Sequence, residues 1–533
     1  MRISKNLRAV AAIALLTSSA AAVAQTATPV IETENGKVQG LEDDGIDAFL
    51  GVRYAKPPIG DLRFKPPEAA DDWTGIADAT GMGAPCMQLY TASGPNESDL
   101  TRGIQGIFPT ATEAKTDNED CLFLNVWTPA AGDGKKRPVM VWFHGGGYAY
   151  GSGGWPAYNG RNLAAKGDVV VVTVNHRLNA FGYLNLAEKF GEEFAASGNV
   201  GNLDLVRSLK WVRDNIAAFG GDPANVTIMG ESGGGSKVSH LMAMPSADGL
   251  FHKAVIQSGP GVSSGKPQDA ADYAGKILDQ AGVETVDDLV TVRADEIVDA
   301  VRKATPASAG MGRGPQFGPI ADGTIIPRDP FLPRAPEQSS DIPVLIGYNK
   351  TEMTLFVASQ PWFGRIDEAG VTGMAAMMGE DAVAAVDAYR AMYPEYSPTH
   401  IASLALGTRF VRGTYLLADQ QARTASAPVY VYRLTWETPV GGGILRSPHT
   451  LDIPFMFNNT KESAALVGTG KEAETMGDMM SDAWLSFAKT GTPSSDLLPE
   501  WQAYTPESRM VMELDVKPRM VDDPERTIRQ IGQ

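Results

Sequence analysis

The chain has 533 residues, of which 43% are hydrophobic and 20% are charged, with a formal net charge of −17 and a pI near 4.9. This composition indicates a globular protein with a large core rather than a disordered or membrane-embedded one. An acidic chain without a basic cluster repels phosphate backbones and anionic bilayers, so we expect no nucleic-acid partner.

Residues 1–24 have the pattern of a secretory signal peptide. Basic residues precede a short apolar run, Ala9 to Leu16, and a stretch of small residues ends at Ala24. The run is less than half of the roughly 20 apolar residues that a transmembrane anchor needs. We therefore expect cleavage after Ala24 and an exported chain, periplasmic or secreted, without a stable membrane anchor. No linker or repeat divides the remainder, so residues 25–533 are expected to form a single domain.

The chain has two cysteines, Cys86 and Cys121. After export they would meet an oxidising compartment, which favours a disulfide closing a loop of about 35 residues. Two buried free thiols are the alternative. Without neighbouring histidines the pair makes a poor zinc site, so no metal is expected.

Apolar, β-branched runs recur without polar alternation, which is typical of strands buried on both faces of a parallel sheet. They cover residues 138–143, 168–175, 225–230, 252–257, 343–349 and 428–436. Between the second and third runs, apolar residues spaced by three or four predict a helix that stops at 220–223, Gly-Gly-Asp-Pro. Several such crossover units predict a doubly wound α/β sheet, which places its active site at the carboxyl ends of its strands.

A glycine-rich segment, His144-Gly145-Gly146-Gly147, directly follows the first of these strands. Glycine lets the backbone approach a substrate closely, so its N–H groups suit stabilisation of an oxyanion. An ordinary glycine turn is the alternative, and a nucleophile motif further along the chain argues against it.

The pattern G-x-S-x-G, which can hold a hydrolase nucleophile, occurs at Ser232 and again at Ser263. A nucleophile elbow needs a strand that runs straight into a helix through a tight turn with small neighbours. Ser232 meets these conditions because the strand at 225–230 leads directly to it and a plausible helix follows. Ser263 is separated from its strand by several residues and is soon followed by Pro267. We therefore favour Ser232.

A serine nucleophile needs a histidine base, and sheet hydrolases place it after an acid that itself follows the serine. Of the histidines after Ser232, His240 and His252 are expected to be packed or surface residues. His449 stands in a loop after the last long strand, and His400 stands at a predicted helix start. Position favours His449, with His400 as the alternative.

The acid must follow a strand that lies between the serine and the histidine. Glu352 comes directly after the strand predicted at 343–349, whereas most other carboxylates of this interval lie in helical or loop sequence. On spacing alone this is the weakest of the three assignments, because a single glutamate is usually a solvated charge.

These segments resemble the type B carboxylesterase family, the α/β-hydrolases that include cholinesterases and liver carboxylesterases. The resemblance spans nearly all of the mature chain, through FLGVRYAKPPIGDLRFKPPEAADDWTG, EDCLFLNVWTP, HGGGYAYGSG, NHRLNAFGYL, NVTIMGESGGG, IGYNKTEM and SPHTLDIPFMF. It implies the α/β-hydrolase fold, a large and mostly parallel central sheet with helices on both faces and inserted helical segments. It implies a triad of Ser232, Glu352 and His449.

The same resemblance implies that the oxyanion donors are Gly146, Gly147 and Gly233 and that Cys86 pairs with Cys121. Ser258 resembles a serine that supports the acid, and a hydrogen bond to an unrelated neighbour is the alternative reading. No metal or organic cofactor is implied.

Three residues depart from the family pattern. Gly233 stands where alanine is usual, His176 replaces a tyrosine, and Asn179 replaces a glycine. None of the three belongs to the triad, and Gly233 keeps its N–H donor.

The expected function is hydrolysis of small-molecule carboxylic esters through an acyl-enzyme. An amidase or carbamate hydrolase would use the same triad, and an inert cholinesterase-like binding or adhesion protein would be expected to lack a triad residue. The inserted segments 261–334 and 362–408 are expected to shape the pocket, with Trp362 and Phe363 as possible lining or core residues. The physiological ester and the oligomeric state are left open.

Overall fold

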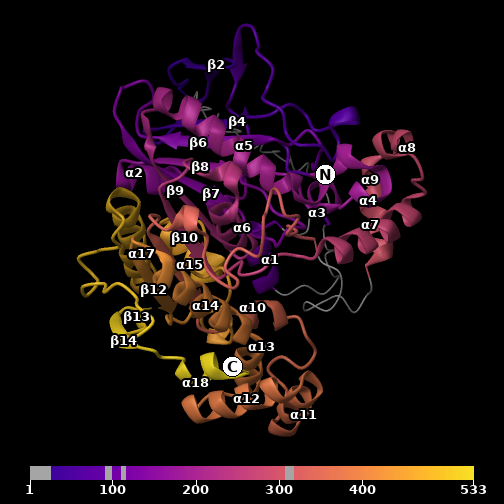
Figure 1. The fold of residues 1–533 in the computed structure, drawn as a ribbon. Helices are drawn as coiled ribbons and strands as arrows, with labels where there is room; N and C mark the ends of the chain where they lie inside the picture. Colours follow the sequence, from indigo (N-terminus) through magenta and orange to yellow (C-terminus); the bar gives the residue numbers. More distant parts are fainter. Residues whose placement is uncertain (1–25, 90–98, 110–115, 306–316, 533) are drawn as a thin grey trace, which may run out of the picture.

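The computed structural model describes residues 26–89, 99–109, 116–305 and 317–532 (Figure 1). The expected signal peptide, residues 1–24, and its cleavage point lie outside the described residues. Within the described residues, no helix has the length and apolar character needed to cross a bilayer.

An 11-stranded sheet forms the centre of the molecule, in the order β14-β13-β12-β11-β10-β9-β7-β8-β6-β4-β3. Its strands are β3 (Leu41–Asp43), β4 (Ile46–Arg53), β6 (Phe123–Thr128), β7 (Arg137–Phe143), β8 (Val170–Val174), β9 (Gly221–Glu231), β10 (Lys253–Gln257), β11 (Val344–Asn349), β12 (Val429–Leu434), β13 (Met510–Leu514) and β14 (Arg519–Asp522). The strands from β13 across to β8 pair in parallel, and those at the two edges pair antiparallel. A separate 3-stranded sheet contains β1 (Ile31–Thr33), β2 (Gly36–Gln39) and β5 (Ile76–Asp78).

The six apolar runs of the sequence form β7 through β12, and the predicted crossover helix is present between β8 and β9. The α-helices are α1 (Asp99–Ile107), α2 (Arg161–Gly167), α3 (Asn179–Tyr183), α4 (Ala187–Phe190), α5 (Val200–Asn215), α6 (Gly233–Ala243), α7 (Pro267–Ala281), α8 (Val286–Thr291), α9 (Ala294–Ala304), α10 (Met353–Val357), α11 (Glu368–Met378), α12 (Glu380–Met392), α13 (Pro398–Leu406), α14 (Thr408–Thr424), α15 (Asp452–Met456), α16 (Ala464–Val467), α17 (Lys471–Thr490) and α18 (Arg526–Gln530).

Apolar side chains alternate across the sheet and fill a core on each face. On β7, Val139 and Val141 belong to one core, and Met140 and Trp142 belong to the other. Helices α5, α6 and α14 pack on the first face, and α2 and α17 pack on the second. Burial on both faces explains why the strand sequences are continuously apolar.

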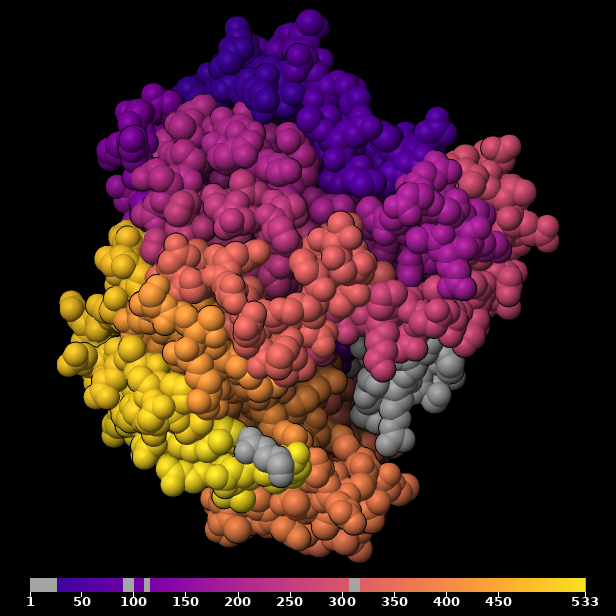
Figure 2. Space-filling view, viewed as in Figure 1, coloured from indigo at the N-terminus to yellow at the C-terminus, as the bar shows by residue number. Residues whose placement is uncertain are grey.

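Helical segments are inserted between the central strands. Helices α7, α8 and α9 lie between β10 and β11, and α10 to α14 lie between β11 and β12. On the face drawn in Figure 2, the N-terminal residues (indigo) and the region of α11 and α12 (orange) occupy opposite ends. The fold is the α/β architecture expected from the sequence, so that prediction is confirmed.

A disulfide joins Cys86 to Cys121, which are 35 positions apart along the chain and have Cα atoms 4.9 Å apart. The closed loop contains α1. Cys121 lies just before β6, a strand of the central sheet. The disulfide therefore holds Cys86, at the other end of this loop, next to the same strand.

Candidate active site

Ser232 lies in the sharp turn between β9 and α6, at the carboxyl end of a central strand. Its backbone has φ 57° and ψ −123°, a conformation that residues other than glycine rarely adopt. The Ser232 N–H donates to the carbonyl oxygen of Gln257 at 2.8 Å, which attaches the turn to the end of β10. This strand, turn and helix form the geometry of a nucleophile elbow.

The residues two before and two after Ser232 have no room for a side chain. A Cβ on Gly230 would lie 2.5 Å from the carbonyl carbon of Gly234. A Cβ on Gly234 would overlap the carbonyl oxygen of Phe143. The two glycines of the motif are therefore required by the close approach of β9, α6 and the end of β7.

His449 and Glu352 meet although they are 97 positions apart in the chain. Glu352 follows β11 at the start of α10, and its Oε2 lies 2.5 Å from His449 Nδ1. The other carboxylate oxygen of Glu352 accepts the Asn349 N–H at 2.8 Å, and the His449 N–H donates to the Glu352 carbonyl at 3.3 Å. Both side chains are buried. A carboxylate in this place can fix the position and tautomer of the imidazole.

A second carboxyl group faces the other ring nitrogen. His449 Nε2 lies 3.1 Å from Oε1 of Glu231, the residue before Ser232, and these two atoms do not form a hydrogen bond of normal geometry. Burial by itself would lower the pKa of His449, but the charges of Glu231 and Glu352 outweigh it and raise that pKa to about 9. Burial raises the pKa of Glu231 well above its usual range, partly offset by the charge of His449.

We predict that Glu231→Gln moves the acid limb of the kcat/KM profile to lower pH. The base must be neutral, and the ionised form of Glu231 places a negative charge beside the ring, which favours the imidazolium. Removing that charge lowers the pKa of His449, so the neutral fraction persists further into the acidic range. A pH profile of ester hydrolysis measures this. An unchanged limb, or a limb moved to higher pH, would contradict the assigned influence of Glu231.

The glycine segment after β7 forms a tight loop against the elbow. Gly146 and Gly147 have φ 82° and 60°, in the left-handed region that glycine adopts without strain. A Cβ on Gly145 would lie 3.4 Å from Ser232 Cβ, so the loop lies close beside Ser232. Within the described ranges, the N–H groups of Gly146, Gly147 and Gly233 have no hydrogen-bond acceptor. These N–H groups are therefore available to a substrate oxygen.

Ser232, Glu231 and His449 border one cavity of about 280 Å³, together with Gly145 and Gly146 of the glycine loop. Its wall is mostly apolar and aromatic and includes Leu100, Ile104, Phe108, Tyr150, Trp155, Tyr158, Leu355, Phe356 and Leu445. The walls come from α1, from the segment after the glycine loop, from the region of α10 and from the loop before His449. Such a site binds a small, largely apolar molecule and presents it to a few polar groups.

The expectation that segments 261–334 and 362–408 shape this cavity is wrong for their described residues, because none of them lines it. Trp362 and Phe363 are partly buried and pack against the core instead. Of the helices inserted between β10 and β12, α10 alone contributes described residues to the cavity wall, and α1, which precedes β6 in the chain, supplies another part of it.

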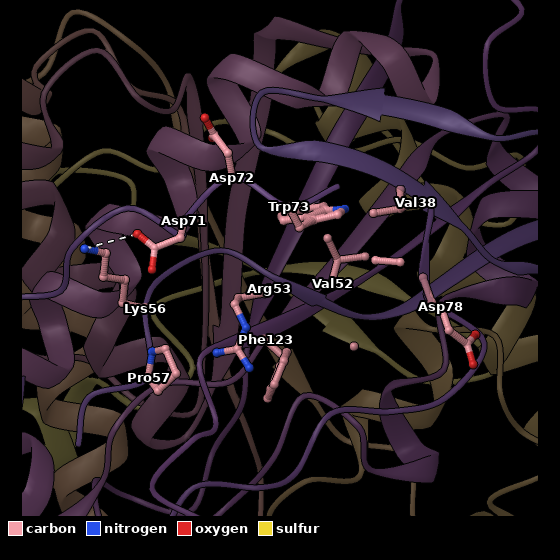
Figure 3. A pocket seen from close by; sticks show the side chains of 13 residues that line it. Val38, Val52, Arg53, Lys56, Pro57, Asp71, Asp72, Trp73, Asp78 and Phe123 are labelled. Atoms are coloured by element: carbon pink, nitrogen blue, oxygen red, sulfur yellow. Dashed lines mark ion pairs between the residues drawn. The ribbon is translucent and has the colours of Figure 1, made fainter. Parts of the chain in front are cut away.

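A larger cavity of about 480 Å³ lies away from Ser232, beside β4 and β5 (Figure 3). Both basic side chains of its lining are already paired, with Lys56 Nζ 3.2 Å from Asp71 Oδ1 and Arg53 bound to Asp120 at 2.6 Å. The described lining contains no serine, cysteine or histidine. Size alone therefore does not mark the reactive cavity.

The alternative serine and two of the other histidines considered in the sequence analysis do not line the cavity at Ser232. Ser263 is in a loop after β10 and borders a different cavity. His400 uses both ring nitrogens, with Ser397 Oγ 2.8 Å from Nδ1 and the Ile444 carbonyl 2.9 Å from Nε2. His240 is likewise engaged through both nitrogens, by the Ser236 carbonyl and by Ser264.

The structure also describes three further residues that the sequence analysis singled out, Ser258, His176 and Asn179. The buried hydroxyl of Ser258 makes no hydrogen bond with a described residue, so its interpretation as a hydrogen-bonding support of Glu352 is wrong. His176 is fully buried, and its ring stacks on that of His144 with centroids 4.8 Å apart. Asn179 has φ 44°, a left-handed conformation that asparagine tolerates better than most residues.

Sequence reasoning did not identify the cavity walls or the part played by Glu231. The aromatic residues Tyr150, Trp155 and Tyr158 follow the glycine loop closely, which is a usable signal for a binding wall. Helix α1 offers no such signal, because its apolar spacing predicts a helix but not the element against which it packs.

Among the described residues, no cluster of three or more His, Cys, Asp or Glu side chains is placed to hold a metal ion.

The sequence model of the carboxylesterase family matches residues 27–530. The chain belongs to this family. It is 36% identical over 505 residues to the para-nitrobenzyl esterase of Bacillus subtilis, covering 94% of this chain and 98% of that protein. The enzyme is a carboxylic ester hydrolase whose substrates are small-molecule esters.

Solved structures of esterases share the fold. A carboxylesterase of Geobacillus stearothermophilus has a TM-score of 0.80 and 37% identity, covering 95% of this chain and 100% of that one. An esterase of Clostridium hathewayi, described as able to hydrolyse aliphatic aromatic polyesters, has a TM-score of 0.78 and 33% identity, covering 94% and 97%. The family's α/β-hydrolase architecture is therefore that of this enzyme.

Proposed function

We propose that the enzyme hydrolyses esters through an acyl-enzyme formed on Ser232. The Ser232 hydroxyl attacks the ester carbonyl carbon while His449 Nε2 accepts its proton, and His449 then gives that proton to the departing alkoxide. Water attacks the acyl-enzyme with the same base, releasing the acid and restoring Ser232. Glu352 orients the imidazole and stabilises its cation.

The N–H groups of Gly146, Gly147 and Gly233 are the proposed donors to the tetrahedral oxyanion. Removal of one such donor costs about 3 kcal/mol of barrier in hydrolases of this kind. Their freedom from other acceptors in the described chain, and the contact of the loop with Ser232, support this assignment.

We propose that the preferred esters have an apolar or aromatic group. The observation that supports this is the aromatic wall of the reactive cavity, with Phe108, Tyr150 and Trp155 among its members. The names of the para-nitrobenzyl esterase and of the polyester-hydrolysing esterase agree with such a preference.

The single observation that carries the mechanism is the convergence of Ser232, His449 and the glycine loop on one cavity. A fluorophosphonate, which phosphonylates activated serines, tests it by intact mass and peptide mapping. We expect one adduct, on the peptide that contains Ser232, and none in the His449→Ala variant. An adduct on Ser263, or no adduct on the wild-type enzyme, would overturn the assignment.

The same intact mass reports where the mature chain begins. We propose that the chain is exported and starts at Gln25, which the disulfide between Cys86 and Cys121 supports because such bonds persist in oxidising compartments. A mass that includes residues 1–24 in the exported protein would contradict it.

Amide or carbamate hydrolysis by the same triad is the alternative selectivity. Ester and amide substrates with the same acyl group distinguish it, because they differ only in the leaving group. We expect kcat/KM to be higher for the ester. A comparable or higher value for the amide would favour the alternative.

A further inference from the structure

A buried lysine lies directly beneath the glycine loop. Lys237 is on α6, the helix that begins at the nucleophile, and its Nζ donates to the carbonyl oxygens of His144 at 2.9 Å and Gly147 at 3.0 Å. Its side chain is fully buried, and in the described part of the chain no carboxylate forms an ion pair with it. Its placement is therefore not explained by a salt bridge.

Burying an amino group in this way is costly, so the contacts that hold it there are informative. Burial lowers the pKa of Lys237 to about 7. Besides the two carbonyls, it faces the ring of Tyr148, whose centroid is 5.2 Å from Nζ. Burial, and then the charge of Lys237, lower the pKa of His144 and of His176 well below the usual value, so both imidazoles are neutral. With or without its extra proton, the amine keeps enough N–H bonds for two carbonyls.

With Lys237, each of the four backbone carbonyls from His144 to Gly147 has a hydrogen-bond partner. The Gly145 carbonyl lies 2.9 Å from His144 Nδ1, and the Gly146 carbonyl accepts the Ala149 N–H at 3.2 Å. Lys237 binds the carbonyls on either side of these two. The N–H of Gly146 shares a trans peptide group with the Gly145 carbonyl, and the N–H of Gly147 shares one with the Gly146 carbonyl, so those two contacts turn both N–H groups away from the bound carbonyls. Lys237 anchors the peptide groups on either side of this pair.

Gly233 makes the contact between Lys237 and Gly147 possible. A Cβ on Gly233 would lie 2.6 Å from Gly147 Cα and would overlap its carbonyl oxygen. The alanine that is usual at this position would therefore displace the Gly147 carbonyl from Lys237. Glycine at position 233, where the family usually has alanine, therefore leaves the space in which the Gly147 carbonyl meets Lys237.

We propose that Lys237 is a positioning residue for the oxyanion hole: it ties the glycine loop to α6 and so holds the N–H groups of Gly146 and Gly147 in register with those of Gly233 and the Ser232 nucleophile. The inference rests on the proposed roles of Ser232 and the three glycines. Lys237 touches no substrate atom and acts through the backbone that it binds.

The test compares Lys237→Met with Lys253→Met. Lys253 is a matched control, because it is another largely buried lysine, bound to Asn225 at the opposite end of the sheet strands from the cavity. We expect Lys237→Met to lower kcat about 30-fold with KM within about threefold, less than the roughly 10²–10³-fold cost of deleting a donor outright. Lys253→Met should leave both constants unchanged.

Inhibition by a trifluoromethyl ketone, compared with inhibition by the corresponding alcohol, measures the oxyanion donors independently of fold stability. Serine hydrolases convert it to a tetrahedral anion, whereas the corresponding alcohol binds without reaction, so only the ketone uses the oxyanion donors. In Lys237→Met we expect the ketone's inhibition constant to rise by the same factor as kcat/KM falls, with the alcohol's constant unchanged. Equal inhibition constants for the ketone in wild type and variant would overturn the proposal.

Gly233→Ala is the second variant and keeps the test decisive if Lys237→Met does not fold. The added methyl group should displace the Gly147 carbonyl and give a similar loss of kcat and of ketone affinity. Since both changes break one contact, the double variant should be little worse than either single one. Gly233→Ala with wild-type ketone affinity, or fully additive losses, would contradict the proposal.

Fluorophosphonate labelling distinguishes failure of the proposed catalytic mechanism from failure of the proposed role of Lys237. A wild-type enzyme unlabelled at Ser232 refutes the mechanism, whereas labelled variants with unchanged kinetics refute only the role of Lys237.

Discussion

Replacing Ser232 with alanine should lower kcat for ester hydrolysis by about 10⁶-fold and leave the fold intact. The hydroxyl is the proposed nucleophile, and loss of that group in a serine, histidine and carboxylate triad removes covalent catalysis entirely. The residual rate should still exceed that in water, because the N–H donors and the cavity remain. Initial rates with a chromogenic ester, measured at high enzyme concentration, give the factor.

Ser263→Ala is the matched control for this change. It alters the other serine in a G-x-S-x-G pattern, at a loop position that borders a different cavity. Its kcat and KM should equal those of the unmodified enzyme. A large loss in Ser263→Ala together with retained activity in Ser232→Ala would reverse the choice of nucleophile.

Replacing Glu352 with glutamine should lower kcat by about 10⁴-fold. The amide has the same shape and retains an oxygen for the Asn349 N–H, but its NH₂ group cannot accept the proton on His449 Nδ1. The imidazole is then driven into the wrong tautomer, and its cation loses a neighbouring charge. The acid limb of the pH profile should also move to lower pH, since the pKa of His449 falls.

Glu352→Asp separates charge from geometry. The shorter side chain keeps the negative charge but moves it away from His449, so kcat should fall less than in Glu352→Gln. The factors are obtained from saturation kinetics at a fixed pH, and thermal unfolding checks that both variants are folded. A kcat in Glu352→Gln within tenfold of wild type would show that another carboxyl group orients the histidine.

Local sequence determined much of the fold and was enough to propose most of the reactive groups. Continuous apolar runs specify buried parallel strands, since a strand covered on both faces has no polar side. The elbow at Ser232 and the loop at Gly146 and Gly147 are also local, because a strained turn or a close backbone approach limits which residue types fit. Glu352 needed the family resemblance, because a carboxylate after a strand is common.

The tertiary structure alone decided which side chains surround these groups. Helix α1, rather than segments 261–334 and 362–408, forms part of the cavity wall, since helical periodicity does not say which partner an apolar face meets. The approach of Glu231 to His449, and of Lys237 to the Gly147 carbonyl, likewise depends on the packing of segments distant in the chain. The sequence by itself determines elements and reactive residue types through short-range sterics. The distances that set the pKa of His449 and the placement of the proposed oxyanion donors arise only when β7, β9, α6 and the loop before α15 pack together.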